Sequence, residues 1–92
     1  MKFSLGQTLL TTGVNNRVAD DKAFAKFVMQ SMSRHVAGDW GNLSPGDAKE
    51  NEYSLSRQLR LLSAYEQEGL PKVWIITEAD RSATTVLFPE EY

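Results

Sequence analysis

The stretch from residue 73 to residue 88 constrains the fold of this chain more than any other segment. It reads VWIITEADRSATTVLF, in which two runs of β-branched and aromatic residues flank a short polar segment, residues 78–81. Two such runs separated by a polar turn are the strongest signal of a β-hairpin in a single sequence. The segment therefore predicts two antiparallel strands, residues 72–77 and 82–88, and Pro89 ends the second one.

Two helices are predicted between the N-terminus and this hairpin. Apolar residues recur at helical spacing over residues 21–37, and Gly38 follows as a residue that readily takes the left-handed conformation at a helix end. Ser44 followed by Pro45 is typical of a helix start, so a second, mostly polar helix is expected from there to about Ser56.

Two further strands are expected. Residues 59–66 alternate, with Leu59, Leu61, Ser63 and Tyr65 on one side, which predicts the first strand of a meander. Residues 5–11 are rich in Leu and Thr and could form a short N-terminal strand. Thr12 and Gly13 then break it, and the Asn and Asp residues that follow indicate turns and a helix start.

These elements predict one domain over residues 1–92. A chain of 92 residues is too short to form two hydrophobic cores. The fold class is α+β: a short N-terminal strand and two to three helices, followed by a three-stranded antiparallel meander, in the order β-α-α-β-β-β.

Composition excludes several classes of function. The chain has no cysteine, which excludes disulfide frameworks and thiolate sites, and its formal net charge is −2. Residues 1–40 carry five basic and three acidic residues, whereas residues 41–92 carry five basic and nine acidic ones. Without a concentrated basic face, nucleic-acid binding is not expected. No segment resembles a signal peptide or spans a bilayer, so a cytoplasmic protein without membrane association is expected.

His35 is the only histidine and the only side chain that ordinarily titrates near neutral pH. It could act as a general base, with Asp39 one turn further on to orient it and Glu78 as a further carboxylate. The alternative is that His35 belongs to the core, because it shares an apolar stripe with Phe27 and Met32. One histidine and adjacent acidic pairs form no metal-ligand pattern, so neither a metal nor a cofactor is expected.

The turn of the hairpin carries the densest group of polar residues. Glu78 and Asp80 could form an acid/base pair, and the guanidinium of Arg81 could hold an anionic ligand. The alternative is that Asp80 and Arg81 only build the turn. We prefer partner binding over catalysis at this turn and predict no catalytic residue.

Trp40 and Trp74 are the aromatic residues best suited to recognition, unless they fill the core. Trp74 and Ile76 point to the face of their strand opposite to Val73 and Ile75. If helices cover only one face, the other exposes apolar surface, which would require a partner or a homodimer. The acidic tail adds Glu90 and Glu91 to the predicted partner-binding residues.

Three segments of the chain resemble a family of small uncharacterised bacterial proteins carried on plasmids, phages and integrated elements. They are residues 35–41 (HVAGDWG), residues 60–65 (RLLSAY), and residues 74–87 (WIITEADRSATTVL) together with the tail PEEY. Members of this family are labelled as plasmid-related proteins or as a type I restriction subunit. The resemblance covers about two-thirds of the chain, and 92 residues cannot hold a methyltransferase domain.

The resemblance implies a mobile-element setting. Small acidic proteins in such a setting often bind a host or defence-system protein, as anti-CRISPR and anti-restriction proteins do. The hypothesis is therefore a non-enzymatic binding module with a host or defence-system protein as its partner. Two alternatives stay open: a small enzyme that uses His35, Asp39 and Glu78, and a nucleic-acid-binding accessory protein.

Overall fold

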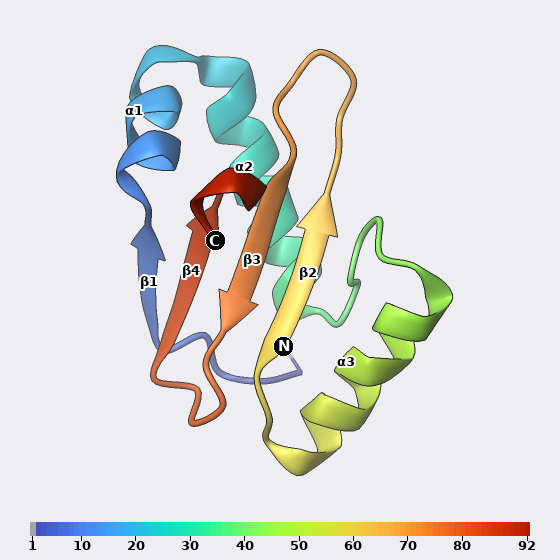
Figure 1. Ribbon diagram of the computed structural model, residues 1–92. Helices are drawn as coiled ribbons and strands as arrows, with labels where there is room; N and C mark the ends of the chain where they lie inside the picture. The colour runs from blue at the N-terminus through green and yellow to red at the C-terminus, as the bar shows by residue number, and fades with distance from the viewer. Residues whose placement is uncertain (1) are drawn as a thin grey trace.

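The chain forms one four-stranded sheet, and the helices pack against it or lie beside its edges (Figure 1). The computed structural model describes residues 2–92. In chain order its elements are β1 (Gln7–Leu10), α1 (Thr12–Asp20), α2 (Lys22–Val36), α3 (Pro45–Arg57), β2 (Leu61–Tyr65), β3 (Val73–Thr77), β4 (Ala83–Leu87) and the 3₁₀ turn η1 (Pro89–Glu91).

The sheet is mixed, with strands in the order β1-β4-β3-β2. Strands β2, β3 and β4 form the predicted antiparallel meander, and Ile75 lies between Ser63 on β2 and Val86 on β4. Strand β1 adds a fourth strand and pairs in parallel with β4, so that Thr8 lies opposite Thr84. The α+β class and the meander are confirmed, and the complete sheet is mixed rather than purely antiparallel.

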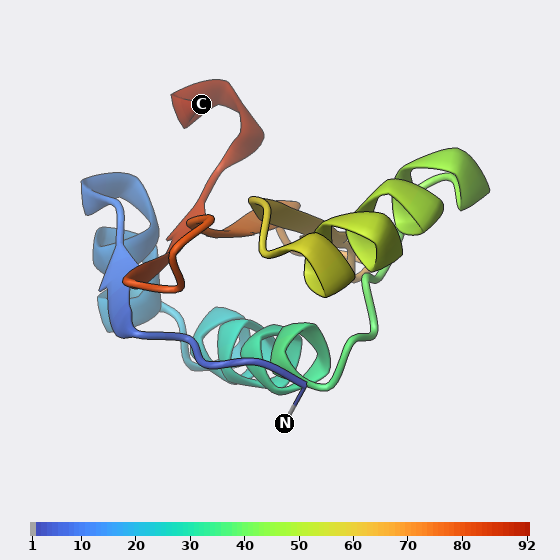
Figure 2. The same ribbon diagram turned by 90° about the horizontal axis from the view of Figure 1, so that it is seen from below.

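The two faces of the sheet have different surroundings. Figure 2 shows α2 along one face, while α3 lies beside the β2 edge and the C-terminal turn rises from the other face. We call the side toward α2 the inner face and the opposite side the outer face. Side chains alternate between them along each strand. The buried core lies between α2 and the inner face and comprises Val14, Phe24, Phe27, Val28, Tyr65, Val73, Ile75 and Val86.

The two predicted helices are confirmed, and side-chain caps define their starts. The carboxylate of Asp21 accepts a hydrogen bond from the backbone N–H of Phe24, which begins α2. The hydroxyl of Ser44 accepts from the N–H of Asp47 at 3.2 Å, which begins α3. Each cap satisfies an amide that has no partner within its own helix.

Helix α1 is the third of the two to three predicted helices, but it lies where Asn15 and Asn16 indicated turns, so the expectation of turns is wrong. The helix start expected at Asp20 and Asp21 is confirmed, because Asp21 caps α2.

The residues of α1 include Gly13 and two asparagines, which are poor helix formers. The helix forms because Thr11 caps it through the N–H of Val14, and because Val14 is fully buried in the core. Tertiary burial of one side chain therefore outweighs weak local propensity.

Strand β2 is at one edge of the sheet, and its side away from β3 is covered by other parts of the chain. Asn51 on α3 uses its side-chain amide like a short strand: its Oδ1 accepts from the N–H of Leu62 at 3.1 Å, and its Nδ2 donates to the Leu62 carbonyl. Further along the strand, the N–H of Asn42 donates to the carbonyl of Ala64 at 2.7 Å, and the Ala64 N–H donates to Trp40. These contacts remove a sheet edge that could pair with another chain.

We therefore expect Asn51→Ala to lower the free energy of unfolding by about 2 kcal/mol, because two backbone groups of Leu62 lose their partners. Urea denaturation measures the change. Glu52→Ala is the matched control, since Glu52 is the next residue on α3 and is exposed. Equal stability of the two variants would show that the amide does not hold this edge.

Candidate functional site

His35 lies at the centre of a buried polar cluster between α2 and the inner face. The side chain is fully buried, and its Nδ1 contacts the hydroxyl of Ser63 on β2. Its Nε2 lies 2.8 Å from Oγ1 of Thr77 on β3. That hydroxyl lies 2.8 Å from Oγ1 of Thr84 on β4, which donates to the carbonyl of Leu5 at 2.7 Å. We call these five groups the His35 network.

The hydrogen-bond directions in this network follow from its last acceptor. A carbonyl oxygen only accepts hydrogen bonds, so the Thr84 hydroxyl donates its hydrogen to the Leu5 carbonyl. The Thr84 oxygen must then accept from the Thr77 hydroxyl. Thr77 then accepts from Nε2–H of His35, which assigns the neutral imidazole with its proton on Nε2. Nδ1 consequently accepts from Ser63. Every donor in the network is used, and neither ring nitrogen is left for a substrate.

The surroundings of His35 favour the neutral imidazole. Burial, and secondarily the positive charge of Arg81, lowers the pKa of His35 to about 4. Two aromatic rings close the site: the Phe3 ring meets the imidazole edge-on at 5.2 Å between centroids, and that of Trp40 does so at 5.8 Å. His35 is therefore uncharged at neutral pH.

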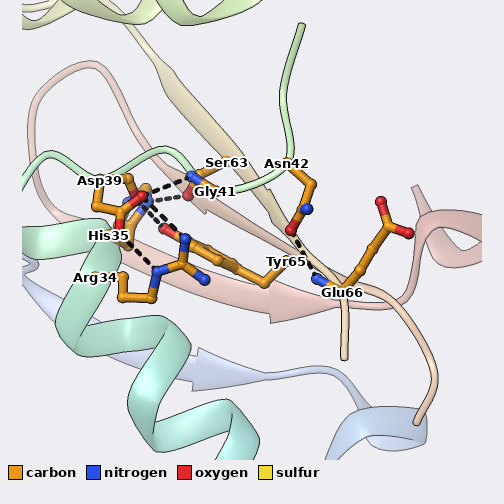
Figure 3. Close-up of polar contacts among 8 residues, drawn as sticks. All are labelled: Arg34, His35, Asp39, Gly41, Asn42, Ser63, Tyr65 and Glu66. Carbon is orange, nitrogen blue, oxygen red and sulfur yellow. Dashed lines mark hydrogen bonds and ion pairs between the residues drawn. The ribbon is translucent and has the colours of Figure 1, made fainter. Parts of the chain in front are cut away.

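Asp39 does not orient His35; it holds the loop that follows α2 (Figure 3). Its carboxylate accepts two hydrogen bonds from Arg34, at 2.7 and 3.1 Å, and one from the N–H of Gly41 at 3.1 Å. The hydrogen bond from Arg34 is the main cause of a lowered pKa of Asp39. Tyr65 donates its hydroxyl to the Asp39 carbonyl at 2.7 Å. Gly41 has a φ of 74°, and a Cβ there would overlap the Ala64 carbonyl.

The three side chains named for catalysis are therefore not connected. Within residues 2–92, no hydrogen bond or ion pair joins any two of His35, Asp39 and Glu78. Glu78 is exposed just beyond the end of β3, whereas His35 is buried. Of the two interpretations of His35, its contacts support the core one.

The turn after β3 is built by the residues predicted to bind a partner. Arg81 has a φ of 60° and directs Nη1 at the carbonyls of Leu59, Glu78 and Ala79, at 2.7, 3.0 and 3.2 Å. Asp80 accepts from the N–H of Ser82 at 3.0 Å. Part of the Arg81 guanidinium is thus bound to backbone carbonyls of the protein itself, while the Glu78 and Asp80 side chains remain exposed.

The two tryptophans have different environments. Trp40 is only 6% exposed and stacks on Phe3, so it belongs to the interior. Trp74 is half-buried on the outer face, where its ring meets that of Tyr92 edge-on at 5.6 Å between centroids. Only Trp74 therefore has the exposure that a recognition residue requires.

Next to Trp74, a groove of about 550 Å³ runs between α3 and the outer face. Leu62, Ala64 and Trp74 supply apolar surface from β2 and β3, and polar residues of α3 and of the loop before it form the rim. A second depression on the outer face lies between the hairpin and the C-terminus, where Ile76 and Leu87 meet Tyr92. Ile76 and Leu87 are nearly buried there, at 4% and 5% exposure, so the expectation of an open apolar face around Ile76 is wrong. Apolar surface on the outer face stays partly open at the groove, where Leu62 and Trp74 are half-buried.

The two glutamates of the tail differ in role. Glu91 accepts hydrogen bonds from the Thr11 hydroxyl at 2.7 Å and from the N–H of Phe88 at 2.8 Å. The bond from Phe88 is the main cause of the lowered pKa of Glu91. Glu91 thereby ties the C-terminus to the start of α1. Glu90 is exposed.

Sequence reasoning named His35 but missed its partners. Ser63, Thr77 and Thr84 look like ordinary strand residues, and all three are fully buried. One signal was available: the alternation placed Ser63 on the same side as Leu61 and Tyr65, and a polar residue on an inward face needs a partner. Asn51, which covers the β2 edge, had no such signal.

No three His, Asp or Glu side chains among residues 2–92 come together as a metal site. In the same range, no helix has the length and apolarity needed to cross a bilayer. Comparison of the chain with models of protein families, with curated proteins and with solved structures found no match.

The buried imidazole predicts a pH dependence of stability. The pKa of His35 is about 4 in the fold and near 6.5 when unfolded, so the unfolded chain binds more protons between these values and stability falls as pH falls. Between pH 7.5 and 5.0 the unfolding free energy should fall by about 2 kcal/mol. His35→Gln should lose most of this dependence in urea denaturation at both pH values.

Gln30→His provides the control, because it adds a histidine at an exposed position of the same helix. An exposed histidine has a similar pKa in both states, so this variant should keep the wild-type pH dependence. The assignment would be refuted by a pH dependence of His35→Gln equal to that of the wild type.

Proposed function

We propose that this protein is a non-enzymatic binding module of mobile-element origin that attaches to a host or defence-system protein through the outer face of its sheet. The observation that carries the proposal is the groove beside Trp74, where a half-buried tryptophan and apolar strand residues are surrounded by polar groups. An apolar centre with a polar rim is the usual anatomy of a protein interface. Tryptophan is also among the residues that contribute most to binding.

The charges around the outer face favour a basic partner surface. Asp47 and Glu50 line the groove with Lys72. Glu78 and Glu91 line the second depression with Arg60. Four carboxylates and two cations leave an acidic excess, which attracts a positively charged surface at long range.

A basic surface is what a nucleic-acid-binding defence complex presents to DNA or RNA. The mobile-element family that the sequence resembles supports the same direction, because anti-CRISPR and anti-restriction proteins act in that setting. The protein would inhibit such a complex by covering its nucleic-acid-binding surface. The His35 network supports a structural rather than a catalytic role for the only histidine, since both ring nitrogens are engaged.

Expression of the protein should protect phage from a type I restriction system or a CRISPR effector complex, measured as plaquing efficiency. Trp74→Glu should reduce both protection and partner affinity at least about tenfold, because it places a charge in the apolar centre. Glu50→Lys should weaken binding as well, and it changes only an exposed rim residue, so that folding is not at issue.

Ala19→Glu is the control, since it adds a charge at an exposed position of α1, away from the groove. The affinity of the wild-type complex should also fall with rising salt, as expected for complementary charges. A protein that neither protects phage nor captures a component of these systems would refute the proposal. So would full activity of Trp74→Glu and Glu50→Lys.

A further inference from the structure

The two edges of the sheet differ in how their backbone groups are satisfied. Strand β1 forms one edge, and its other side faces no strand (Figure 1). The N–H groups of Gln7 and Thr11 donate to β4, to Ser82 at 2.9 Å and Val86 at 3.1 Å. Because backbone groups alternate along a strand, those of Thr8 and Leu10 point away from β4.

No described residue covers this edge as Asn51 covers β2. Within residues 2–92, the hydrogen bonds outside regular helices and strands include none to the N–H or carbonyl groups of Thr8 and Leu10. The open backbone N–H and carbonyl groups of these two residues can form hydrogen bonds with a strand of another chain.

An apolar groove runs along the same edge. Its volume is about 490 Å³, and it lies between β1 and α2 on the inner face. It has no charged lining residue: beside Thr8 it is formed by Leu10, Val18, Ala25, Val28, Met29 and Met32. Two large apolar residues stand open here, since Met29 is 71% exposed and Leu9 on the outer side of β1 is 40% exposed.

From the edge and the groove together, we infer that the protein forms a two-fold symmetric dimer in which β1 pairs antiparallel with β1 of a second copy. A two-fold axis at Leu9 places Thr8 opposite Leu10 of the second copy. The open N–H and carbonyl groups of both residues then meet their counterparts in the register of an antiparallel ladder. The two sheets become one continuous eight-stranded sheet.

Self-pairing also accounts for the exposed side chains. Leu9 meets Leu9 of the second copy on the outer side, where the pair is not hydrogen-bonded and side chains come closest. On the inner side, the two grooves adjoin, so that each Met29 is covered by apolar residues of the other copy. An uncharged groove accepts its own copy without bringing like charges together.

The contact is small. It involves about 10 residues of each copy, fewer than the roughly 20 to 30 of a standard interface. We expect weak association, with a dissociation constant of about 10 to 100 μM. The inference does not depend on the proposed function, because it uses the β1 edge and not the groove beside Trp74.

Sedimentation velocity from about 5 μM to 1 mM tests the dimer over the range that this affinity requires. Leu9→Lys should weaken dimerisation at least tenfold, because it brings two cations together on the axis. Leu59→Lys should leave dimerisation unchanged; it is matched in residue type and exposure, 45% against 40% for Leu9. A wild-type protein that stays monomeric up to 1 mM overturns the inference.

Cysteine cross-linking tests the register, since the chain has no cysteine of its own. Across the axis, two Leu9→Cys residues have Cα atoms about 4.5 Å apart, within the range of a disulfide. Gln7→Cys lies two residues from the axis, and its copies are about 13 Å apart, too far to be joined. Efficient formation of a disulfide-linked dimer by Leu9→Cys alone supports the register. Leu59→Cys is the control outside the contact. A disulfide yield of Gln7→Cys or Leu59→Cys equal to that of Leu9→Cys overturns the register.

Discussion

A buried imidazole needs a partner for each ring nitrogen, and in this protein that requirement joins helix α2 to the sheet. His35 reaches β2 through Ser63 and β3 through Thr77, and the chain of hydroxyls continues to β4 and ends at the carbonyl of Leu5. One side chain thus ties the helix, three strands and the N-terminal segment together. The same segment carries Phe3, whose ring meets the imidazole edge-on.

The chain covers some parts of the sheet and leaves others open to contact. The inner face is occupied by α2, the apolar core and the His35 network. The β2 edge is covered by Asn51 and by the loop that follows α2. The surfaces that remain available are the outer face beside Trp74 and the open edge of β1. The first has charged residues on its rim, whereas the groove along the second has no charged lining residue.

Local sequence patterns predicted the elements whose signals lie within a few residues. The hairpin, helix α2 and helix α3 lie where alternation, helical spacing and capping residues placed them. The position of helix α1 was not predicted, because its residues are poor helix formers and its stability comes from Val14 in the core. The exposure of the acidic and aromatic candidates depends on neighbours far away in sequence, as the burial of Trp40 illustrates.

By itself, the sequence determined the α+β class, the meander and the alternation that separates Val73 and Ile75 from Trp74 and Ile76, because these depend on local periodicity. Only the tertiary structure decided the parallel pairing of β1 with β4, the partners of His35 and the use of Asp39 to hold a loop. Each of these brings together residues that are distant in the chain or chooses among several nearby partners. Such choices are made by packing the whole domain, since local preference does not distinguish between them.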